Sequence, residues 1–311
     1  MYAVECRGLT RTYGNIVALD NLDISVEEGV IFGFLGPNGA GKTTTLRILT
    51  GLGRATSGSA RVAGEVVRPN STPLQSKIGY LPEEPAFYNW MTGREFLTYA
   101  GRLFRLPGAE TARRCDELLE LVDLSGAASR RIGGYSRGMR QRLGIAQALI
   151  NRPAVLFLDE PGSALDPLGR AEVLQTLLRL KAQATTVFLS SHILADVERV
   201  CDIVAIVDKG RLVVKASIEE LRRRFARSLF ELEFEEKAAS LADALGKTPW
   251  VEKVDVFDGE RRLVVSTSDV STAKRELPGL VAGSGLALHR YELVLPTLEQ
   301  VFIELVGKKG G

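Results

Sequence analysis

A glycine-rich loop at residues 36–41, within FGFLGPNGAGKTTTLRILTGL (32–52), has the composition of a phosphate-binding site. Because glycine has no Cβ atom, such a loop can turn successive backbone N–H groups toward one point, and the N-terminus of a following helix adds more. Lys42 and Thr43 complete the spacing G-x-x-x-x-G-K-T, which supplies an ammonium group for the terminal phosphates and a hydroxyl group for Mg²⁺. An apolar run before the loop and spaced leucines after it provide the strand and helix that this motif requires. The stretch therefore predicts a nucleotide-binding loop.

Two carboxylates and a histidine supply groups that nucleotide hydrolysis would need. Asp159 and Glu160 end the apolar run VLFLDE, and His192 follows the next run in FLSSHILADVE. The carboxyl ends of neighbouring parallel strands meet in one crevice, so we expect these side chains to lie beside the phosphate loop. There Asp159 can hold Mg²⁺ through water, and Glu160 can polarise an attacking water molecule. The alternatives are a solvated strand end for the two acids and an ordinary polar residue for the histidine.

The elements that must position these groups form an α/β pattern over residues 1–215. Apolar runs at 31–35, 154–159, 185–190 and 202–208 have the composition of strands buried on both faces of a parallel sheet. Helical patterns separate these runs, as expected for strands backed by helices. Between about residues 87 and 150 only helix-compatible segments occur, which predicts a helical insertion in the α/β core.

A second unit is expected after residue 215. Residues 216–227 have the pattern of a linker helix with a solvated basic face, and residues 228–311 contain alternating runs typical of half-buried strands. The predicted order is β-α-β-β-α-β-α, with Tyr291, Leu293 and Leu295 on the last strand, which suggests a small α+β domain of ferredoxin-like form. His289 is in phase with these three residues, so we expect it to be half-buried. We expect this unit to serve dimer contact or regulation, with a small-ligand sensor as the alternative.

Composition limits the partners of the chain. Its 311 residues carry a net charge of +2, so no broad basic surface is expected and no nucleic-acid partner is predicted. Its apolar runs are shorter than the roughly 18 residues that cross a bilayer, and its first residues lack a secretory pattern. Cys6, Cys115 and Cys201 lack metal-ligand spacing and are expected to be reduced thiols. We therefore expect a cytoplasmic protein.

Taken together and in order, the motifs of residues 1–215 resemble the nucleotide-binding domain of ATP-binding cassette (ABC) ATPases. GPNGAGKT is similar to Walker A, VLFLDE to Walker B, SALD (163–166) to the D-loop, SSH to the switch histidine, and GGYSRGMRQRLGIAQAL to the signature segment. The resemblance implies a P-loop NTPase of ABC type that binds ATP and Mg²⁺, with Lys42, Glu160 and His192 as catalytic residues. The metal ligands that it implies are Thr43, Glu83 and Asp159. The nucleotide contacts that it implies are Tyr13, which would stack on adenine, with Gly36, Pro37, Asn38, Gly39, Ala40, Gly41, Lys42, Thr43, Thr44, Ser136, Gly138 and Asp166.

Two motifs depart from the family pattern. The signature usually has the sequence L-S-G-G-Q, whereas this chain has YSRGM at 135–139, which keeps Ser136 and Gly138 but introduces Arg137 and Met139. Glu83, in IGYLPEEPAFYNWMT, stands where the family usually has the Q-loop glutamine. Its carboxylate is still an oxygen ligand suited to Mg²⁺, yet it adds negative charge beside the phosphates.

The resemblance also implies a mechanism shared by two copies of the chain. The copies would close head to tail around two ATP molecules, with Ser136 and Gly138 of one copy touching the γ-phosphate held by the other. Asp166 would support the opposite site across this homodimer. Glu160 would act as the general base, and hydrolysis would remove the phosphate bridge that holds the dimer closed.

The stretch LPEEP and the C-terminal stretch PTLEQVFIELVG resemble the corresponding sequences of ATPase subunits of type-2 ABC exporters, including drug-resistance and sodium-extrusion groups. This implies a separate transmembrane permease docked near Glu83 and residues 87–91, which would hold the protein at the inner face of the membrane. Phe87, Tyr88, Trp90 and Met91 are the expected contact, or else ordinary core residues of the insertion. The alternative function is a soluble ABC ATPase whose ATP-gated dimerisation regulates a cytosolic partner. A small GTPase is disfavoured because the sequence has no N-K-x-D motif.

Overall fold

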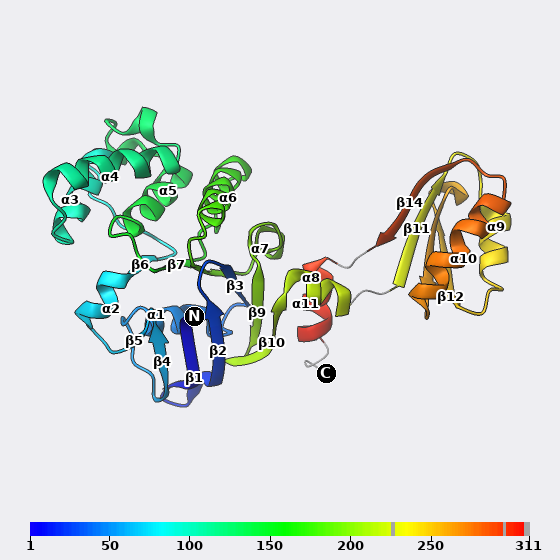
Figure 1. The fold of residues 1–311 in the computed structure, drawn as a ribbon, viewed down its shortest axis with the longest axis horizontal. Coiled ribbons are helices and arrows are strands. Elements are labelled where there is room, and N and C mark those ends of the chain that lie inside the picture. Colours follow the sequence, from blue (N-terminus) through cyan, green and yellow to red (C-terminus); the bar gives the residue numbers. More distant parts are fainter. Residues whose placement is uncertain (225–227, 295–296, 308–311) are drawn as a thin grey trace. The chain divides into compact units, whose positions relative to one another are not determined.

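The computed structural model describes residues 1–224, 228–294 and 297–307, and the chain divides into two compact units, Met1–Ile218 and Glu219–Gly311 (Figure 1). Each unit has a hydrophobic core of its own. Within the described residues, every helix is too short or too polar to cross a bilayer. The three cysteines are buried and free.

A six-stranded sheet forms the centre of the first unit, in the order β10-β9-β3-β8-β7-β6. Every residue of β3, β8 and β7, three of the four interior strands of this sheet, is buried, which confirms these continuous apolar runs as interior strands. The ring of Phe188 on β8 packs against rings on both neighbouring strands, with centroid distances of 5.2 to 5.6 Å. Because β3, β8 and β7 pair in parallel, their carboxyl ends lie at one edge of the sheet. The parallel strands are β3 (Ile31–Leu35), β6 (Ile78–Leu81), β7 (Val155–Asp159), β8 (Val187–Ser191) and β9 (Ile203–Asp208), and β10 (Arg211–Ser217) is antiparallel to β9.

A smaller antiparallel sheet, in the order β2-β1-β4-β5, was not among the predicted strands. It consists of β1 (Tyr2–Tyr13), β2 (Ile16–Glu27), β4 (Ser57–Val62) and β5 (Glu65–Val66). Its buried side chains share one core with helix α1 (Lys42–Leu49) and with Phe34 of the parallel sheet. The sheet therefore places Tyr13, at the end of β1, near the loop that begins α1.

The helices of the first unit include three that lie between residues 93 and 148 and gather at one end of the unit (Figure 1). The buried Arg142 guanidinium on α5 donates to the Val122 carbonyl oxygen at 2.7 Å and pairs with Glu172 on α6 at 2.9 Å. These contacts fix α5 against α6. The helices are α2 (Thr72–Lys77), α3 (Gly93–Leu103), α4 (Gly108–Leu121), α5 (Arg137–Ala148), α6 (Pro167–Ala182) and α7 (Leu194–Val200), with 3₁₀ turns at Ser125–Ala127 and Ile132–Gly134.

The second unit contains a four-stranded antiparallel sheet in the order β12-β13-β11-β14. Phe230, Leu232 and Leu263 lie at the centre of a core that the helices α9 and α10 complete. The elements are α8 (Ile218–Arg224), β11 (Ser228–Phe234), α9 (Ala239–Leu245), β12 (Val251–Phe257), a 3₁₀ turn at Asp258–Glu260, β13 (Arg262–Thr267), α10 (Val270–Gly283), β14 (Leu288–Val294) and α11 (Leu298–Gly307).

One detail predicted for the last strand is wrong. His289 is exposed, together with its neighbours on β14, instead of half-buried. The reason is that β14 is an edge strand, flanked within the described residues by β11 alone. Leu295, which was placed on the same strand, lies outside the described residues.

Candidate functional site

The phosphate loop connects β3 to α1 and has glycine where a side chain would not fit. Gly39 and Gly41 have φ angles of +82° and +101°, in the left-handed region that disfavours other residues. A Cβ atom on Gly41 would lie 2.5 Å from the Ala18 carbonyl oxygen, and one on Gly36 would lie 2.4 Å from the Val207 carbonyl oxygen. Helix α1 begins at Lys42, so its first N–H groups, which have no partner within the helix, face the loop. Together they form an anion-binding turn.

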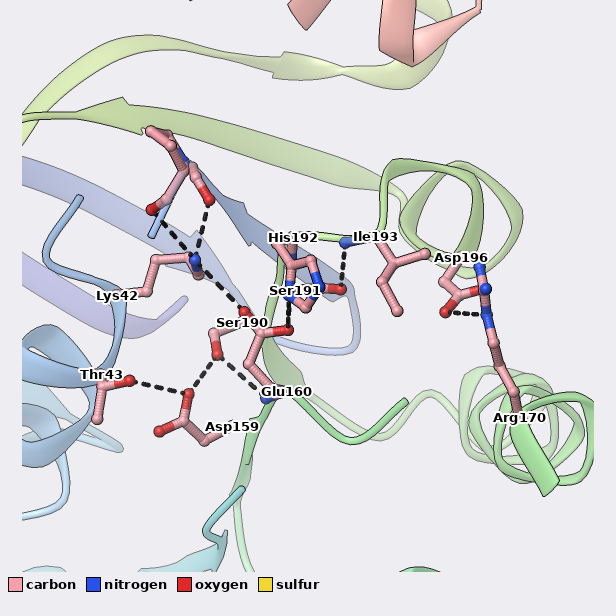
Figure 2. A network of polar contacts seen from close by, with 12 residues as sticks. Lys42, Thr43, Asp159, Glu160, Arg170, Ser190, Ser191, His192, Ile193 and Asp196 are labelled. Carbon is pink, nitrogen blue, oxygen red and sulfur yellow. Dashed lines mark hydrogen bonds and ion pairs between the residues drawn. The ribbon is translucent and has the colours of Figure 1, made fainter. Parts of the chain in front are cut away.

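Lys42 and Glu160 meet at the centre of the site, where both side chains are more than nine-tenths buried. The Lys42 Nζ atom donates to the Gly36 carbonyl oxygen at 2.9 Å and lies 3.4 Å from Glu160 Oε1 (Figure 2). The other carboxylate oxygen, Oε2, accepts the backbone N–H of His192 at 3.2 Å and lies 2.8 Å from the Nδ1 atom of its ring. Glu160 has a φ angle of +48°, a strained value of the kind that collects at functional sites. The carboxylate is therefore held between a cation and an imidazole.

Asp159 lies beside this group and faces the start of α1. Its Oδ1 atom accepts the Ser190 hydroxyl at 2.6 Å and lies 3.5 Å from the Thr43 hydroxyl (Figure 2). Burial raises the pKa of the Asp159 carboxyl above its usual value, although the hydrogen bonds from Ser190 and Thr43 act to lower it. A bound cation would favour the ionised form. A carboxylate and a hydroxyl at this spacing suit Mg²⁺, which takes its other ligands from phosphates and water.

One cleft of about 480 Å³ is lined by side chains from the phosphate loop, by Glu160 and His192, and by Tyr13 and Glu83. Tyr13 is 46% exposed, and the Arg11 guanidinium lies 4.3 Å from its ring centroid. Glu83 follows β6 and is exposed. The cleft therefore combines an aromatic surface, a phosphate loop and oxygen ligands. Its lining residues are Tyr13, Ile16, Val17, Ala18, Asn38, Gly39, Gly41, Lys42, Thr43, Thr44, Glu83, Glu160, Ser163 and His192.

Three of the predicted nucleotide contacts lie elsewhere in the same chain. Ser136 caps α5 and accepts the Met139 N–H at 3.2 Å, while Asp166 caps α6 and accepts the Gly169 N–H at 3.0 Å. Gly138 is buried against Gly169, so the two helix N-termini pack together. None of the three lines the cleft around Lys42. Within one chain, the signature segment and the phosphate loop are therefore separate.

Sequence reasoning missed Ser190 and the pair formed by Arg170 and Asp196. Ser190 is fully buried, and besides Asp159 it contacts the Glu160 backbone N–H, with Oγ 3.3 Å from that nitrogen. The Arg170 Nε atom lies 2.7 Å from both carboxylate oxygens of Asp196 on α7 (Figure 2). A serine that ends an apolar strand opposite two acids is the signal that could have identified Ser190.

An exposed aromatic surface lies on the helical part of the unit. Trp90 is 67% exposed and Tyr88 is 41% exposed, with their ring centroids 4.9 Å apart. Phe87 is half-buried against the buried Phe96 of α3, and Met91 is also half-buried. Exposed Tyr99, on α3, extends this surface.

Two family models match the chain. The model described as "ABC transporter" matches residues 19–163, which include the phosphate loop and the Asp159–Glu160 pair. The model described as "ATP-binding protein DrrA1-3-like, C-terminal domain" matches residues 217–306.

Curated relatives match over almost the whole chain. An uncharacterised ABC transporter ATP-binding protein, YxlF of Bacillus subtilis (strain 168), is 41% identical over 98% of this chain and 99% of its own length. The daunorubicin resistance ATP-binding protein DrrA2 of Streptomyces coeruleorubidus is 37% identical over 99% of this chain and 96% of its own length. The bacitracin transport ATP-binding protein BcrA of Bacillus licheniformis is 34% identical over 98% and 97%, respectively.

Solved structures share the fold of the first unit. An ATP-binding subunit of an ABC transporter superposes with a TM-score of 0.63 at 32% identity and covers 72% of this chain and 93% of its own. The ATP-binding cassette MJ0796, in a dimeric post-hydrolysis state bound to ADP and Pi, gives a TM-score of 0.62 at 25% identity, over 69% and 98%.

Proposed function

This chain belongs to the ATP-binding proteins of ABC transporters, and we propose that it powers export through a separate permease subunit. It is an ABC transporter ATPase, and ATPases of this family work with membrane permease subunits. The proposal depends chiefly on one observation. The Glu160 carboxylate contacts both the Lys42 ammonium group and the His192 ring beside the phosphate loop. Export is favoured by the names of the full-length relatives, which refer to daunorubicin resistance and bacitracin transport.

ATP would enter the cleft with its adenine against Tyr13 and its phosphates in the loop. The N–H groups of residues 36–44 and the Lys42 ammonium group would bind the β- and γ-phosphates. Mg²⁺ would be held by Thr43, Asp159 and Glu83, all of which offer oxygen atoms. When bound by these residues, Mg²⁺ would offset the negative charge of the transferred phosphoryl group.

Glu160 is the proposed general base of hydrolysis. Its carboxylate is more than nine-tenths buried and is held by the hydrogen bond from the His192 backbone, so it can accept a proton from a water molecule in a fixed position. The His192 ring is 47% exposed, which leaves it free to contact the γ-phosphate as well as Glu160. Lys42 would stabilise the charge that develops on the phosphoryl group.

The separation of the signature segment from the phosphate loop favours a site completed by a second copy. Ser136 and Gly138 at the start of α5 would reach the γ-phosphate held by the partner, and Asp166 would support that site. The dimeric state of the similar cassette MJ0796 supports this arrangement. Since the γ-phosphate would bind both copies, ATP would favour the closed homodimer and hydrolysis would release it.

The C-terminal unit is proposed to be a ferredoxin-like domain that regulates or contacts the dimer. Its β-α-β-β-α-β order and the strand order β12-β13-β11-β14 support the ferredoxin-like interpretation. The match of residues 217–306 to the DrrA1-3-like C-terminal model supports a separate domain after the nucleotide-binding unit.

The proposed docking surface for the permease consists of Tyr88 and Trp90, next to Glu83 and the half-buried Phe87 and Met91. Exposed aromatic residues of this kind are common at interfaces, where they contribute much of the binding energy. Through this contact the protein would lie at the cytoplasmic face of the membrane.

A crosslinked pull-down from native membranes tests the proposal. The bait is tagged protein carrying Glu160→Gln, which should hold ATP and the closed dimer. We expect mass spectrometry to identify a polytopic membrane protein in nearly equal amount. Recovery of cytosolic proteins alone would overturn the export proposal and favour a regulatory ABC ATPase.

Replacing Trp90 with alanine should weaken capture of that permease by about 30-fold, the effect of losing a hot-spot aromatic worth roughly 2 kcal/mol. The side chain is 67% exposed, so its removal should leave folding and ATP turnover of the isolated subunit unchanged. Quantitative pull-down against a dilution series measures the effect. Tyr2→Ala, which removes a half-exposed aromatic from β1, is the matched control, and an equal loss with it would contradict a specific surface.

A further inference from the structure

A second cavity, of about 340 Å³, shares Glu83 with the nucleotide cleft. Its other walls come from residues 84 and 85 and from the start of α5, where Tyr135, Arg137, Arg140 and Gln141 line it. One carboxylate therefore borders both the space for the phosphates and the space beside the signature segment.

Two opposite charges that line this cavity have no partner of their own. Glu83 and Arg137 are exposed, and neither forms a hydrogen bond or an ion pair with another residue in the part of the chain that the structure describes. Arg140 differs, because its guanidinium reaches the Gly133 carbonyl oxygen at 3.5 Å and its Nε atom is buried. Of the two arginines, Arg137 is thus the one whose guanidinium can turn toward Glu83.

We propose that Arg137 is a positioning residue whose guanidinium pairs with the Glu83 carboxylate across this cavity. The inference extends the proposed function, since it assumes that the cleft binds ATP and that Ser136 and Gly138 act on a partner's nucleotide. The pair offsets the negative charge that Glu83 places beside the phosphates, because an opposite charge nearby lowers the electrostatic repulsion. Because Arg137 lies between Ser136 and Gly138, the pair also links the signature segment to Glu83 in the wall of the nucleotide cleft.

The pair accounts for both departures from the family pattern together. Besides the Mg²⁺ that Glu83 is proposed to share with Thr43 and Asp159, its carboxylate faces the phosphates with a negative charge, and Arg137 on α5 supplies a second cation that offsets this charge. A substitution of Arg137 should then change nucleotide affinity only in a protein that retains Glu83. It must also fade at high salt, since the Debye length falls from about 10 Å at 0.1 M to about 3 Å at 1 M.

A double-mutant cycle tests the pair. Binding of a fluorescent ATP analogue with Mg²⁺ is measured at low protein concentration for wild type, Glu83→Gln, Arg137→Gln and the double variant. We expect Arg137→Gln to weaken binding about two- to five-fold in the wild-type background, the range of a partly exposed ion pair, and to have no effect beside Glu83→Gln. The loss should disappear at 1 M salt, and Arg137→Lys should retain most of the affinity. Arg140→Gln is the matched control.

Each outcome has a distinct meaning. Additive effects of the two substitutions in a protein that binds the analogue would overturn the pair and leave the proposed function intact. The same would follow if Arg140→Gln gave an equal loss that depends on Glu83, since a general charge effect would then suffice. Failure of the wild-type protein to bind the analogue would instead refute the proposed function itself.

Discussion

Replacing Glu160 with glutamine should slow ATP hydrolysis by about 10²- to 10⁴-fold, the usual contribution of a general base. Glutamine has nearly the same volume, and its carbonyl oxygen can still accept the His192 backbone N–H, which now lies 3.2 Å from Glu160 Oε2. The change removes the negative charge with which the proposed general base would take a proton from water. It also removes the charge that faces the Lys42 Nζ atom at 3.4 Å, so the ammonium group is freer to bind phosphate. We therefore expect ATP binding to persist while turnover stops.

Two measurements check this prediction. Phosphate release gives the loss of turnover, and size-exclusion chromatography with ATP and Mg²⁺ should show a dimer that wild type does not accumulate. Glu28→Gln is the matched control because Glu28 is exposed and outside the cleft, and it should leave both results unchanged. Turnover within a few-fold of wild type in the Glu160 variant would show that another group acts as the base.

Replacing Lys42 with alanine should weaken ATP binding on the order of 10- to 150-fold, the loss expected for charge-assisted hydrogen bonds worth roughly 1.5–3 kcal/mol. The Nζ atom is positioned for phosphate by the Gly36 carbonyl oxygen at 2.9 Å. The substitution also leaves the buried Glu160 carboxylate without its cation, which destabilises that part of the fold. Calorimetric titration with ATP measures the affinity, and thermal unfolding separates it from stability.

Lys237→Ala provides the comparison for this variant, since Lys237 is exposed in the second unit and pairs with Glu260 on the surface. It should change neither ATP affinity nor the unfolding temperature of the first unit. Unchanged ATP affinity in a folded Lys42 variant would contradict the role of the phosphate loop.

Much of the first unit could be predicted from its sequence, because its centre obeys simple patterns. Continuous apolar runs identified β3, β7, β8 and β9, since strands covered on both faces are apolar along most of their length. Because these strands are parallel and adjacent, the residues at their carboxyl ends lie at one edge of the sheet. The structure does bring Lys42, Asp159, Glu160 and His192 together there.

What could not be predicted depends on contacts between distant segments. The strands β1, β2 and β4 bury only part of their residues and have shifts of register, so their patterns are weaker than those of the parallel strands. The position of β14 at the sheet edge, which exposes His289, follows from strand order and not from alternation. That Glu83 borders two cavities depends on how the loop after β6 packs against α5.

The measurement that tests the central claim most directly is complementation between two inactive variants. Lys42→Ala removes the ammonium group proposed to bind the phosphates. Ser136→Asp keeps a residue that caps α5, and it would place a negative charge where the partner's γ-phosphate is proposed to bind. If each site combines the loop of one copy with the signature segment of the other, a mixed dimer contains one intact site. An equimolar mixture should then recover up to about a quarter of wild-type turnover, since random pairing makes half of the dimers mixed. A mixture of folded variants no more active than either alone would contradict hydrolysis at shared sites.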